Sequence, residues 1–363
     1  MSPDLPSAVG LLCHCRAGFE AELAAELTER AAAADVVGYA RAQRNDAYAL
    51  FFSDDTRLGE RFSWRELIFA RQKLRLLAEL RDVPPTDRIS PILQLLRGLP
   101  RFGDVWVEHP DSDSGKPLAG LTRSFANALR PALRREHLLS DRPRPEWPRL
   151  HVLFLAGDHL LLAYADPADS APWPLGIPRL KLHPDAPSRS ALKLEEALLT
   201  LLSDTERDAW LQPGMRAADL GAAPGGWTWV LARRHLHVTA IDNGPLRPHV
   251  LETGLVEHLR ADGFHWRPSK PLDWLVCDMV EQPRRVAVRI GEWFQAGWCR
   301  HAIFNLKLPM KKRWQETQVC LERFRQSAAI PLTVRARQLY HDREEITVFA
   351  STAVAPVPSD SNG

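Results

Sequence analysis

Six prolines between residues 165 and 190 divide this chain of 363 residues into two parts. Proline fixes φ and lacks an amide hydrogen, so neither a long helix nor a central strand can pass through this segment. A typical domain has about 150 residues, so the chain has room for a folded unit on each side. We therefore expect an interdomain linker at residues 166–187.

Beyond this segment, short apolar stretches alternate with helix-length segments. We expect strands at residues 217–220, 237–241, 274–277 and 302–306. Such alternation predicts a parallel, doubly wound sheet in a Rossmann-like α/β domain. Two more strands, 334–339 and 346–350, flank a polar turn and predict an antiparallel hairpin at the sheet edge. We place this domain at residues 188–355, followed by a disordered tail at 356–363.

The first part of the chain mixes strand and helix patterns less regularly. Helical spacing of apolar residues predicts helices at 18–34 and 118–135. Strand patterns occupy residues 9–15, 47–53, 105–109 and 150–164. The first part is therefore predicted to be α+β.

The composition excludes several classes of protein. With 45% hydrophobic and 25% charged residues, the chain is an ordinary globular protein and neither fibrous nor disordered. A net charge of +2 means that any nucleic-acid surface must be a local patch. Five scattered cysteines and the lack of a secretory leader favour a reducing cytoplasm. No apolar run approaches the roughly 18 residues that span a bilayer, so no membrane association is expected.

A glycine-rich loop follows the first strand of the second domain, in the sequence Asp-Leu-Gly-Ala-Ala-Pro-Gly-Gly-Trp at residues 219–227. Small residues let a ligand approach the backbone, and the helix that follows offers free N–H groups. The glycine spacing does not match the G-x-G-x-x-G of dinucleotide folds. The next strand ends at Asp242, whose carboxylate is suited to ribose hydroxyls, and Asp262 is a candidate for an adenine amino group.

This loop resembles that of the S-adenosylmethionine-dependent ribose 2′-O-methyltransferases of the FtsJ-like group. The resemblance implies that the cofactor contacts Ser190, Gly221, Ala223, Pro224, Gly225, Gly226, Trp227, Asp242, Asp262 and Asp278. Related loops often carry Cys where this chain has Ala223, a small change that should not affect cofactor binding. No metal is expected.

The same resemblance implies a catalytic Lys-Asp-Lys-Glu tetrad, with Lys307 as the general base. The candidates, in chain order, are Lys193, Asp278, Lys307 and Glu345. Glu344 is the alternative to Glu345, which we prefer because the family places its glutamate directly before the β-branched and aromatic residues of the last strand. If that strand runs antiparallel to the others, its start lies at the edge where the other strands end, and ligands bind at that edge.

An ordinary lysine, with a pKa near 10.4, is a poor base at neutral pH. The charge of Lys193 and the positive sulfonium of the cofactor would lower the pKa of Lys307, whereas Asp278 and Glu345 would raise it. The sequence leaves open which effect is larger.

Other chemistries fit less well. Amino-methylating enzymes carry an Asn/Asp-Pro-Pro-aromatic loop, where this chain has Asp278-Met-Val-Glu. Pyrimidine C5 methylation needs a nucleophilic cysteine, and Cys277 lies in an apolar strand. The Cys13-His14-Cys15 triplet has no second ligand pair, so we interpret it as strand packing.

Residues 122–150 include seven arginines but only three acidic residues. This excess suits RNA phosphates and equally suits a solvated helix face. The region resembles a THUMP domain, which we place at 56–165 after a ferredoxin-like segment at 1–55.

Over nearly its full length the chain is similar to the RlmM family, bacterial enzymes that methylate a cytidine ribose in 23S ribosomal RNA. The resemblance implies a monomeric, cytoplasmic enzyme. A transfer-RNA methyltransferase and a non-catalytic assembly factor that binds S-adenosylmethionine are the alternatives.

Overall fold

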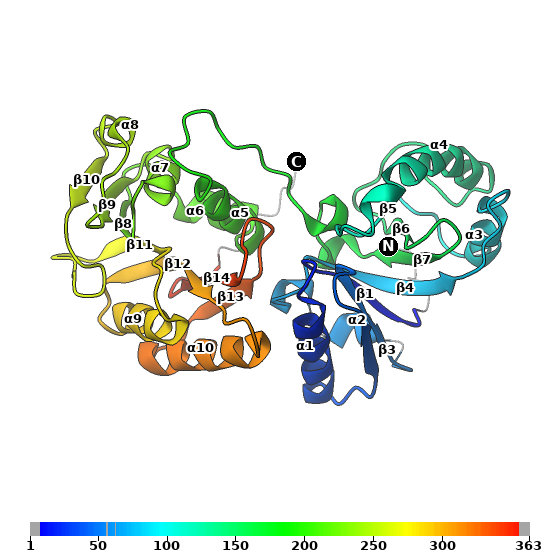
Figure 1. Cartoon of the computed structure of the whole chain (residues 1–363), viewed down its shortest axis with the longest axis horizontal. Helices are drawn as coiled ribbons and strands as arrows, with labels where there is room; N and C mark the ends of the chain where they lie inside the picture. The colour runs from blue at the N-terminus through cyan, green and yellow to red at the C-terminus, as the bar shows by residue number, and fades with distance from the viewer. Residues whose placement is uncertain (1–7, 56, 62, 356–363) are drawn as a thin grey trace. The chain divides into compact units, whose positions relative to one another are not determined.

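The computed structural model describes residues 8–355, except residues 56 and 62. The chain divides after Pro178 into two compact units, and each contains a seven-stranded sheet (Figure 1). The disordered tail predicted at 356–363 lies outside the described residues. Among the described helices, none is long and apolar enough to cross a membrane.

The sheet of the N-terminal unit has the strand order β2-β3-β1-β4-β7-β6-β5. Its strands are β1 (Gly10–His14), β2 (Tyr39–Ala42), β3 (Tyr48–Phe52), β4 (Gln72–Leu80), β5 (Asp104–Glu108), β6 (Arg149–Phe154) and β7 (Leu160–Ala165). Its helices are α1 (Glu20–Ala33), α2 (Leu58–Arg61), α3 (Ile89–Leu96) and α4 (Ala119–Arg135). Neighbouring strands are antiparallel except β5 and β6, which are parallel.

Strand β4 joins the two halves of this sheet, because it pairs with β1 on one side and with β7 on the other. Helix α1 packs near β2 and β3, whereas α3 and α4 cover a core formed with β5, β6 and β7. The α+β character predicted for this part of the chain is confirmed.

The sheet of the C-terminal unit has the strand order β10-β9-β8-β11-β12-β14-β13. Its strands are β8 (Arg216–Leu220), β9 (His237–Ile241), β10 (Val256–Leu259), β11 (Leu272–Cys277), β12 (Cys299–Lys307), β13 (Thr333–Arg337) and β14 (Glu345–Ser351). Its helices are α5 (Ala191–Leu201), α6 (Asp204–Trp210), α7 (Gly226–Ala232), α8 (Pro248–Leu251), α9 (Pro283–Gln295) and α10 (Arg313–Ala328).

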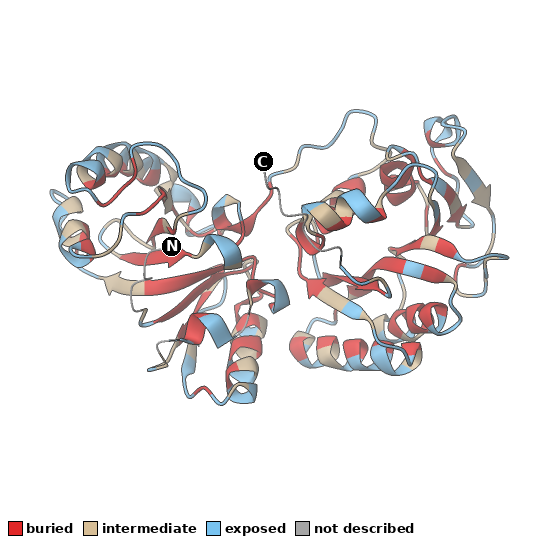
Figure 2. Cartoon of the chain, turned by 180° about the vertical axis from the view of Figure 1, so that it is seen from behind, coloured by how far each residue is buried: buried red, intermediate tan, exposed pale blue. Residues whose placement is uncertain are grey.

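Helices cover both faces of this sheet, with α9 and α10 on one face and α5, α6 and α7 on the other (Figure 1). The central strands are buried along most of their length (Figure 2). Trp274, Ile303 and Phe349 on the α5 face join one apolar cluster. The predicted Rossmann-like α/β fold is confirmed.

The strands from β10 to β12 are parallel, so their carboxyl ends lie at one edge of the sheet. Strand β14 runs antiparallel to β12, and its first residue, Glu345, lies opposite Lys307. Strands β13 and β14 also pair antiparallel, which confirms the predicted edge hairpin, and the start of β14 reaches the edge where β12 ends.

The first part of the proline-rich segment is bound to the N-terminal unit. Asp169 accepts hydrogen bonds from the backbone N–H of Trp64 at 2.7 Å and from the Ser63 hydroxyl at 3.0 Å. The N–H of Leu175 donates to Glu108 at 2.8 Å. Residues 177–187 contain neither helix nor strand, as their prolines require.

Candidate functional site

The four predicted tetrad side chains meet at the carboxyl edge of the C-terminal sheet. The Nζ atom of Lys307 lies 2.8 Å from Asp278 Oδ1 and forms an ion pair with Glu345 Oε2. The Nζ atom of Lys193 lies 3.2 Å from Asp278 Oδ2 and forms an ion pair with Glu345 Oε1. Each lysine therefore contacts both carboxylates, and the cluster alternates in charge.

The structure brings Glu345 into this cluster and not Glu344. The side chain of Glu345 is only 4% exposed, whereas that of Glu344 is 47% exposed and pairs with Arg313 at 2.7 Å. Glu345 is the first residue of β14, whereas Glu344 lies in the preceding turn.

The carboxylates keep Lys307 protonated. Burial of the Lys307 amine disfavours its charge, but Asp278 and Glu345 outweigh this and raise the pKa of Lys307. Burial raises the pKa of Asp278, but Lys307 and Lys193 outweigh this effect and hold the pKa below its ordinary value. In the protein without cofactor, the two carboxylates therefore raise the pKa of Lys307 more than the surrounding protein lowers it.

Glu196, which the sequence analysis did not identify, ties the helix of Lys193 to the hairpin of Glu345. Its carboxylate accepts hydrogen bonds from the backbone N–H groups of Tyr340 at 2.8 Å and His341 at 2.9 Å. The His341 ring nitrogen Nδ1 lies 2.7 Å from the same carboxylate. Because Glu196 is one helical turn from Lys193, this contact fixes the position of the lysine against the sheet.

The glycine-rich loop lies between β8 and α7. Gly221 has a φ of +78°, and a Cβ atom there would lie 2.7 Å from Met279 Cγ. Gly225 has a φ of +108°, which side-chain-bearing residues rarely adopt. A Cβ atom on Gly226 would lie 2.2 Å from Ser190 Oγ. The positive φ values favour glycine at positions 221 and 225, and a side chain at 226 would displace Ser190.

Ser190 lies beside the loop. The indole N–H of Trp227 donates to the carbonyl of Ser190 at 3.0 Å, and the hydroxyl of Ser190 contacts that of Ser188 at 2.6 Å. Since Ser190 immediately precedes α5, the loop and the Lys193 helix are joined.

Asp242 follows β9 and faces the loop. Its carboxylate accepts from the backbone N–H of Ala223 at 3.0 Å and of Gly244 at 2.7 Å. Asp262 follows β10 and is exposed, and it accepts from Phe264 N–H at 2.8 Å and lies 2.7 Å from His265 Nδ1. Both carboxylates retain lone pairs for a ligand.

Asp219, at the start of the loop motif, is a buried carboxyl group that the sequence analysis did not single out. Thr228 donates to its Oδ2 at 2.6 Å, while Oδ1 is buried without a hydrogen-bond partner among the described residues. Burial is the main cause that raises the pKa of Asp219 to about 7.

Replacing Asp219 by Asn should stabilise the fold more at alkaline than at acidic pH. Because the folded-state pKa is raised to about 7, the native protein loses stability as pH rises from about 4 to 7, and Asn does not titrate. At about 1.4 kcal/mol per pKa unit, the advantage of Asp219→Asn should grow by about 2.6 kcal/mol between pH ~5 and ~8. Urea unfolding at both pH values measures this, and a constant difference would contradict it.

All five cysteines are buried. Burial raises the pKa of Cys277 and of Cys13 to about 12 each, and the pKa of Cys15 also rises. These thiols remain protonated, which disfavours a nucleophilic role for Cys277. Within the described part of the chain, no group of three or more His, Cys, Asp or Glu residues could hold a metal ion.

Two arginines of the predicted basic helix have intramolecular partners. Arg130 donates to Asp104 and to the carbonyl of Val105, both at 2.6 Å, and Arg134 donates to the carbonyl of Ser140 at 3.3 Å. Arg123, Arg135, Arg142 and Arg144 are exposed. Arg130 therefore serves the packing of α4 against β5.

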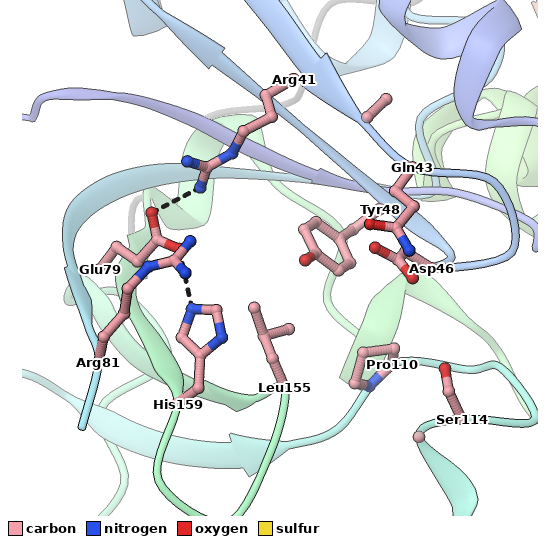
Figure 3. A pocket seen from close by; sticks show the side chains of 12 residues that line it. Arg41, Gln43, Asp46, Tyr48, Glu79, Arg81, Pro110, Ser114, Leu155 and His159 are labelled. Carbon is pink, nitrogen blue, oxygen red and sulfur yellow. Dashed lines mark hydrogen bonds and ion pairs between the residues drawn. The ribbon is translucent and has the colours of Figure 1, made fainter. Parts of the chain in front are cut away.

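A pocket of about 380 Å³ opens in the N-terminal unit (Figure 3). Glu79 on one side accepts hydrogen bonds from Arg41 at 2.6 Å and Arg81 at 2.7 Å, and it lies 2.8 Å from His159 Nε2. Gln43 and Asp46 lie across the pocket, with the Tyr48 ring between the two sides (Figure 3). The pocket thus combines guanidinium groups, an aromatic ring and hydrogen-bonding side chains.

Comparisons with known proteins agree with this organisation. Models of the RlmM ferredoxin-like domain, of the N-terminal region of ribosomal RNA large subunit methyltransferase M and of the FtsJ-like methyltransferase match residues 9–74, 87–166 and 186–296. The ribosomal RNA large subunit methyltransferase M of Xanthomonas axonopodis pv. citri is 72% identical over 342 residues, covering 94% of this chain and 99% of that protein. The chain belongs to this family. The relative from Xanthomonas campestris pv. campestris strain B100 has the same identity and coverage.

The family is that of a ribosomal RNA methyltransferase, so the resemblance stated from the sequence is confirmed. Among solved structures, TrmN from Thermus thermophilus is 17% identical and covers 94% of this chain and 99% of its own, with a TM-score of 0.35.

Proposed function

We propose that this enzyme transfers a methyl group from S-adenosylmethionine to the 2′-hydroxyl of a cytidine in 23S ribosomal RNA. The observation that carries the proposal is the Lys193, Asp278, Lys307 and Glu345 cluster at the carboxyl edge of the sheet. Ligands of open α/β sheets bind at this edge, and the glycine-rich loop opens onto it.

The chemistry requires a base at an alcohol that is much less acidic than any side-chain acid. Lys307 accepts the 2′-hydroxyl proton, while Asp278 and Glu345 hold its amine and that of Lys193 in fixed positions. The cofactor supplies an electrophilic methyl group on a positively charged sulfur. A nearby positive charge lowers the pKa of Lys307 and so offsets the two carboxylates.

The residues around the loop fit the cofactor. Gly221, Gly225 and Gly226 give close access to the backbone, with Ala223, Pro224, Trp227 and Ser190 around them. Asp242 and Asp262 would hold the ribose and the adenine, and Asp278 would face the reacting end.

Asp242→Ala should weaken S-adenosylmethionine binding by about 1–3 kcal/mol, because buried ribose hydroxyls lose a charged acceptor. Calorimetric titration measures the affinity. Asp208→Ala, at an exposed position on α6, is the matched control. Unchanged affinity in Asp242→Ala would assign Asp242 to the loop structure alone, through its bonds to Ala223 and Gly244.

The N-terminal unit is proposed to bind the RNA. Its pocket fits one unpaired nucleotide, with the phosphate at Arg41 and Arg81 and the base on Tyr48 (Figure 3). The arginine side chains are 46% and 61% exposed, so both are accessible to phosphate.

Replacing Arg41 and Arg81 together by Ser should weaken RNA binding and lower its salt dependence by about 1–2 in the slope of log K against log salt. Fluorescence anisotropy with a labelled 23S fragment measures both quantities. Arg97→Ser, at another exposed site of the same unit, should change neither. Equal slopes for the double variant and the native protein would move the RNA contact away from this pocket.

The substrate class is tested by methyl transfer from labelled S-adenosylmethionine to purified RNA from cells that lack the protein. Label in large-subunit RNA supports the proposal, and label only in transfer RNA would establish the alternative. Binding of cofactor without transfer to either RNA would identify a non-catalytic assembly factor. We expect a monomer in the cytoplasm, and sedimentation at several concentrations tests the oligomeric state.

A further inference from the structure

A chain of hydrogen bonds runs from the tetrad into the core between β12, β14 and the hairpin loop. The amide of Asn305 donates through Nδ2 to Asp278 Oδ1 at 2.9 Å. The hydroxyl of Thr347 lies 2.7 Å from Asn305 Oδ1 and 2.9 Å from Asp342 Oδ2. Asn305, Thr347 and Asp342 are each at most 1% exposed. None of the three belongs to the tetrad.

The strand register places these hydrogen-bonded residues beside the reacting groups. Asn305 lies opposite Thr347 just as Lys307 lies opposite Glu345. Alternate residues of a strand share a face, so both pairs project from the same side of the sheet.

The number of available protons decides which group donates and which accepts in each of these hydrogen bonds. Asp278 is a carboxylate between two lysines and only accepts, so the Asn305 amide must present its N–H₂ to Asp278 and its oxygen to Thr347. Thr347 has a single hydroxyl proton, which it gives to Asn305 Oδ1. The contact between Thr347 and Asp342 then needs a second proton, which the carboxyl group of Asp342 can supply.

The surroundings of Asp342 agree with a protonated acid. The charged groups that act on it include Glu345 on β14 and Glu196 and Lys193 on α5. Burial is the main cause that raises the pKa of Asp342 well above its usual range, and the charge of Glu345 adds to it. The N–H of Leu339, which donates to Oδ2 at 3.1 Å, opposes the shift only in part.

We propose that protonated Asp342, Thr347 and Asn305 form a positioning network that orients Asp278 and sets the proton affinity of Lys307. Asn305 Nδ2 and Lys307 Nζ both contact Asp278 Oδ1, at 2.9 and 2.8 Å. Because the amide shares this oxygen, it weakens the hold of Asp278 on the Lys307 proton. The network thus favours release of that proton, and this role rests on the proposed function of Lys307.

Thr347→Val keeps the shape of the side chain and removes the hydroxyl, so Asn305 Oδ1 loses its hydrogen-bond donor and the amide is free to turn from Asp278. We expect kcat to fall by about 10–10²-fold, because misplacement of a catalytic group costs rate even without loss of binding. The KM for S-adenosylmethionine should stay nearly constant. The rise of kcat with pH should move to higher pH by about half a unit to one unit, since Lys307 holds its proton more tightly.

Two substitutions serve as comparisons for Thr347→Val. Thr347→Ser restores the hydroxyl and should recover most of the rate and the native pH profile. Thr317→Val makes the same change at a buried threonine of α10 whose hydroxyl has no hydrogen-bond partner among the described residues. Its pH profile should be native. A Thr347→Val enzyme with the native pH profile would overturn the proposal, even if its rate were lower.

Asp342→Asn tests the proton on Asp342 without any measurement of activity. Its amide can donate to Thr347 as the acid does, so its thermal stability should be close to native. Infrared spectra of the native protein at pH ~9, where Asp219 is mostly ionised, should contain a carboxylic-acid carbonyl band that Asp342→Asn lacks. Identical spectra would show that Asp342 is ionised and would overturn the network, whatever RNA the enzyme methylates. Failure to methylate ribose with this band present would instead overturn the proposed function.

Discussion

Lys307→Arg is expected to abolish turnover while leaving the affinity for S-adenosylmethionine nearly intact. Arginine keeps the positive charge between Asp278 and Glu345, but it cannot be deprotonated at accessible pH. Loss of a general base typically costs about 10²–10⁴-fold in rate. Single-turnover transfer measures the rate, and calorimetry measures cofactor binding.

The native enzyme provides the control for this variant. Since its Lys307 pKa is raised, the amine is protonated at neutral pH and the rate should rise with pH as the neutral form appears. Lys307→Arg should show no such rise. If Lys307→Arg retained more than about a tenth of native turnover, the base would lie elsewhere, and Lys193 would be the next candidate.

Asp278→Asn should lose both activity and stability. The Asp278 carboxylate contacts Lys193 and Lys307 and is only 16% exposed, so its removal leaves two partly buried amines that share Glu345 alone. Breaking a buried ion pair costs up to about 3–5 kcal/mol, and partial exposure reduces this to about 1–3 kcal/mol. We expect a rate loss of at least about 10²-fold, because both amines lose a fixed partner.

Asp208→Asn makes the same change at an exposed position on α6 and should alter neither property. Unfolding in urea and single-turnover kinetics measure the two effects.

The pKa of Asp278 is lowered in the fold, so its contribution to stability is present at neutral pH and is lost as the pH falls into the acidic range. The stability difference between Asp278→Asn and the native protein should therefore shrink at low pH. A native rate in Asp278→Asn would show that Asp278 has no role in methyl transfer.

The sequence predicted the C-terminal sheet well because its strands are short, apolar and separated by helix-length segments. The glycine-rich loop and the positions of Lys307 and Glu345 at strand ends then placed most of the candidate site. Strand β10 (Val256–Leu259) was not predicted, because its four residues include Glu257 and His258 and are only partly buried at the sheet edge.

Strand β4 was also not predicted, and the reason lies in tertiary contacts. Its sequence, Gln-Lys-Leu-Arg-Leu-Leu-Ala-Glu-Leu, is rich in residues that favour helices. Lys73 is nevertheless buried in the strand, because its amine donates to the Gly59 carbonyl at 2.8 Å and pairs with Asp169. These partners lie far away in sequence, so local patterns do not reveal them.

The supporting residues of the site were missed for a similar reason. Glu196 contacts His341 across 145 positions of sequence, and Asn305 contacts Thr347 across 42. The strand register could have predicted the second contact: Asn305 and Thr347 lie two residues from Lys307 and Glu345, on the same face. The proton proposed for Asp342 depends on burial and on contacts such as those with Leu339 and Thr347, which no motif encodes.

The most direct test of the central claim asks whether the enzyme methylates a ribose. Alkali cleaves RNA through the 2′-hydroxyl, so a 2′-O-methyl group leaves an alkali-resistant dinucleotide. Large-subunit RNA from cells lacking the protein should be treated with the native enzyme or with Lys307→Arg, digested in alkali and analysed by mass spectrometry. We expect one resistant dinucleotide with 2′-O-methylcytidine at its 5′ side, formed by the native enzyme alone. A methyl group on a base, with no resistant dinucleotide, would contradict it.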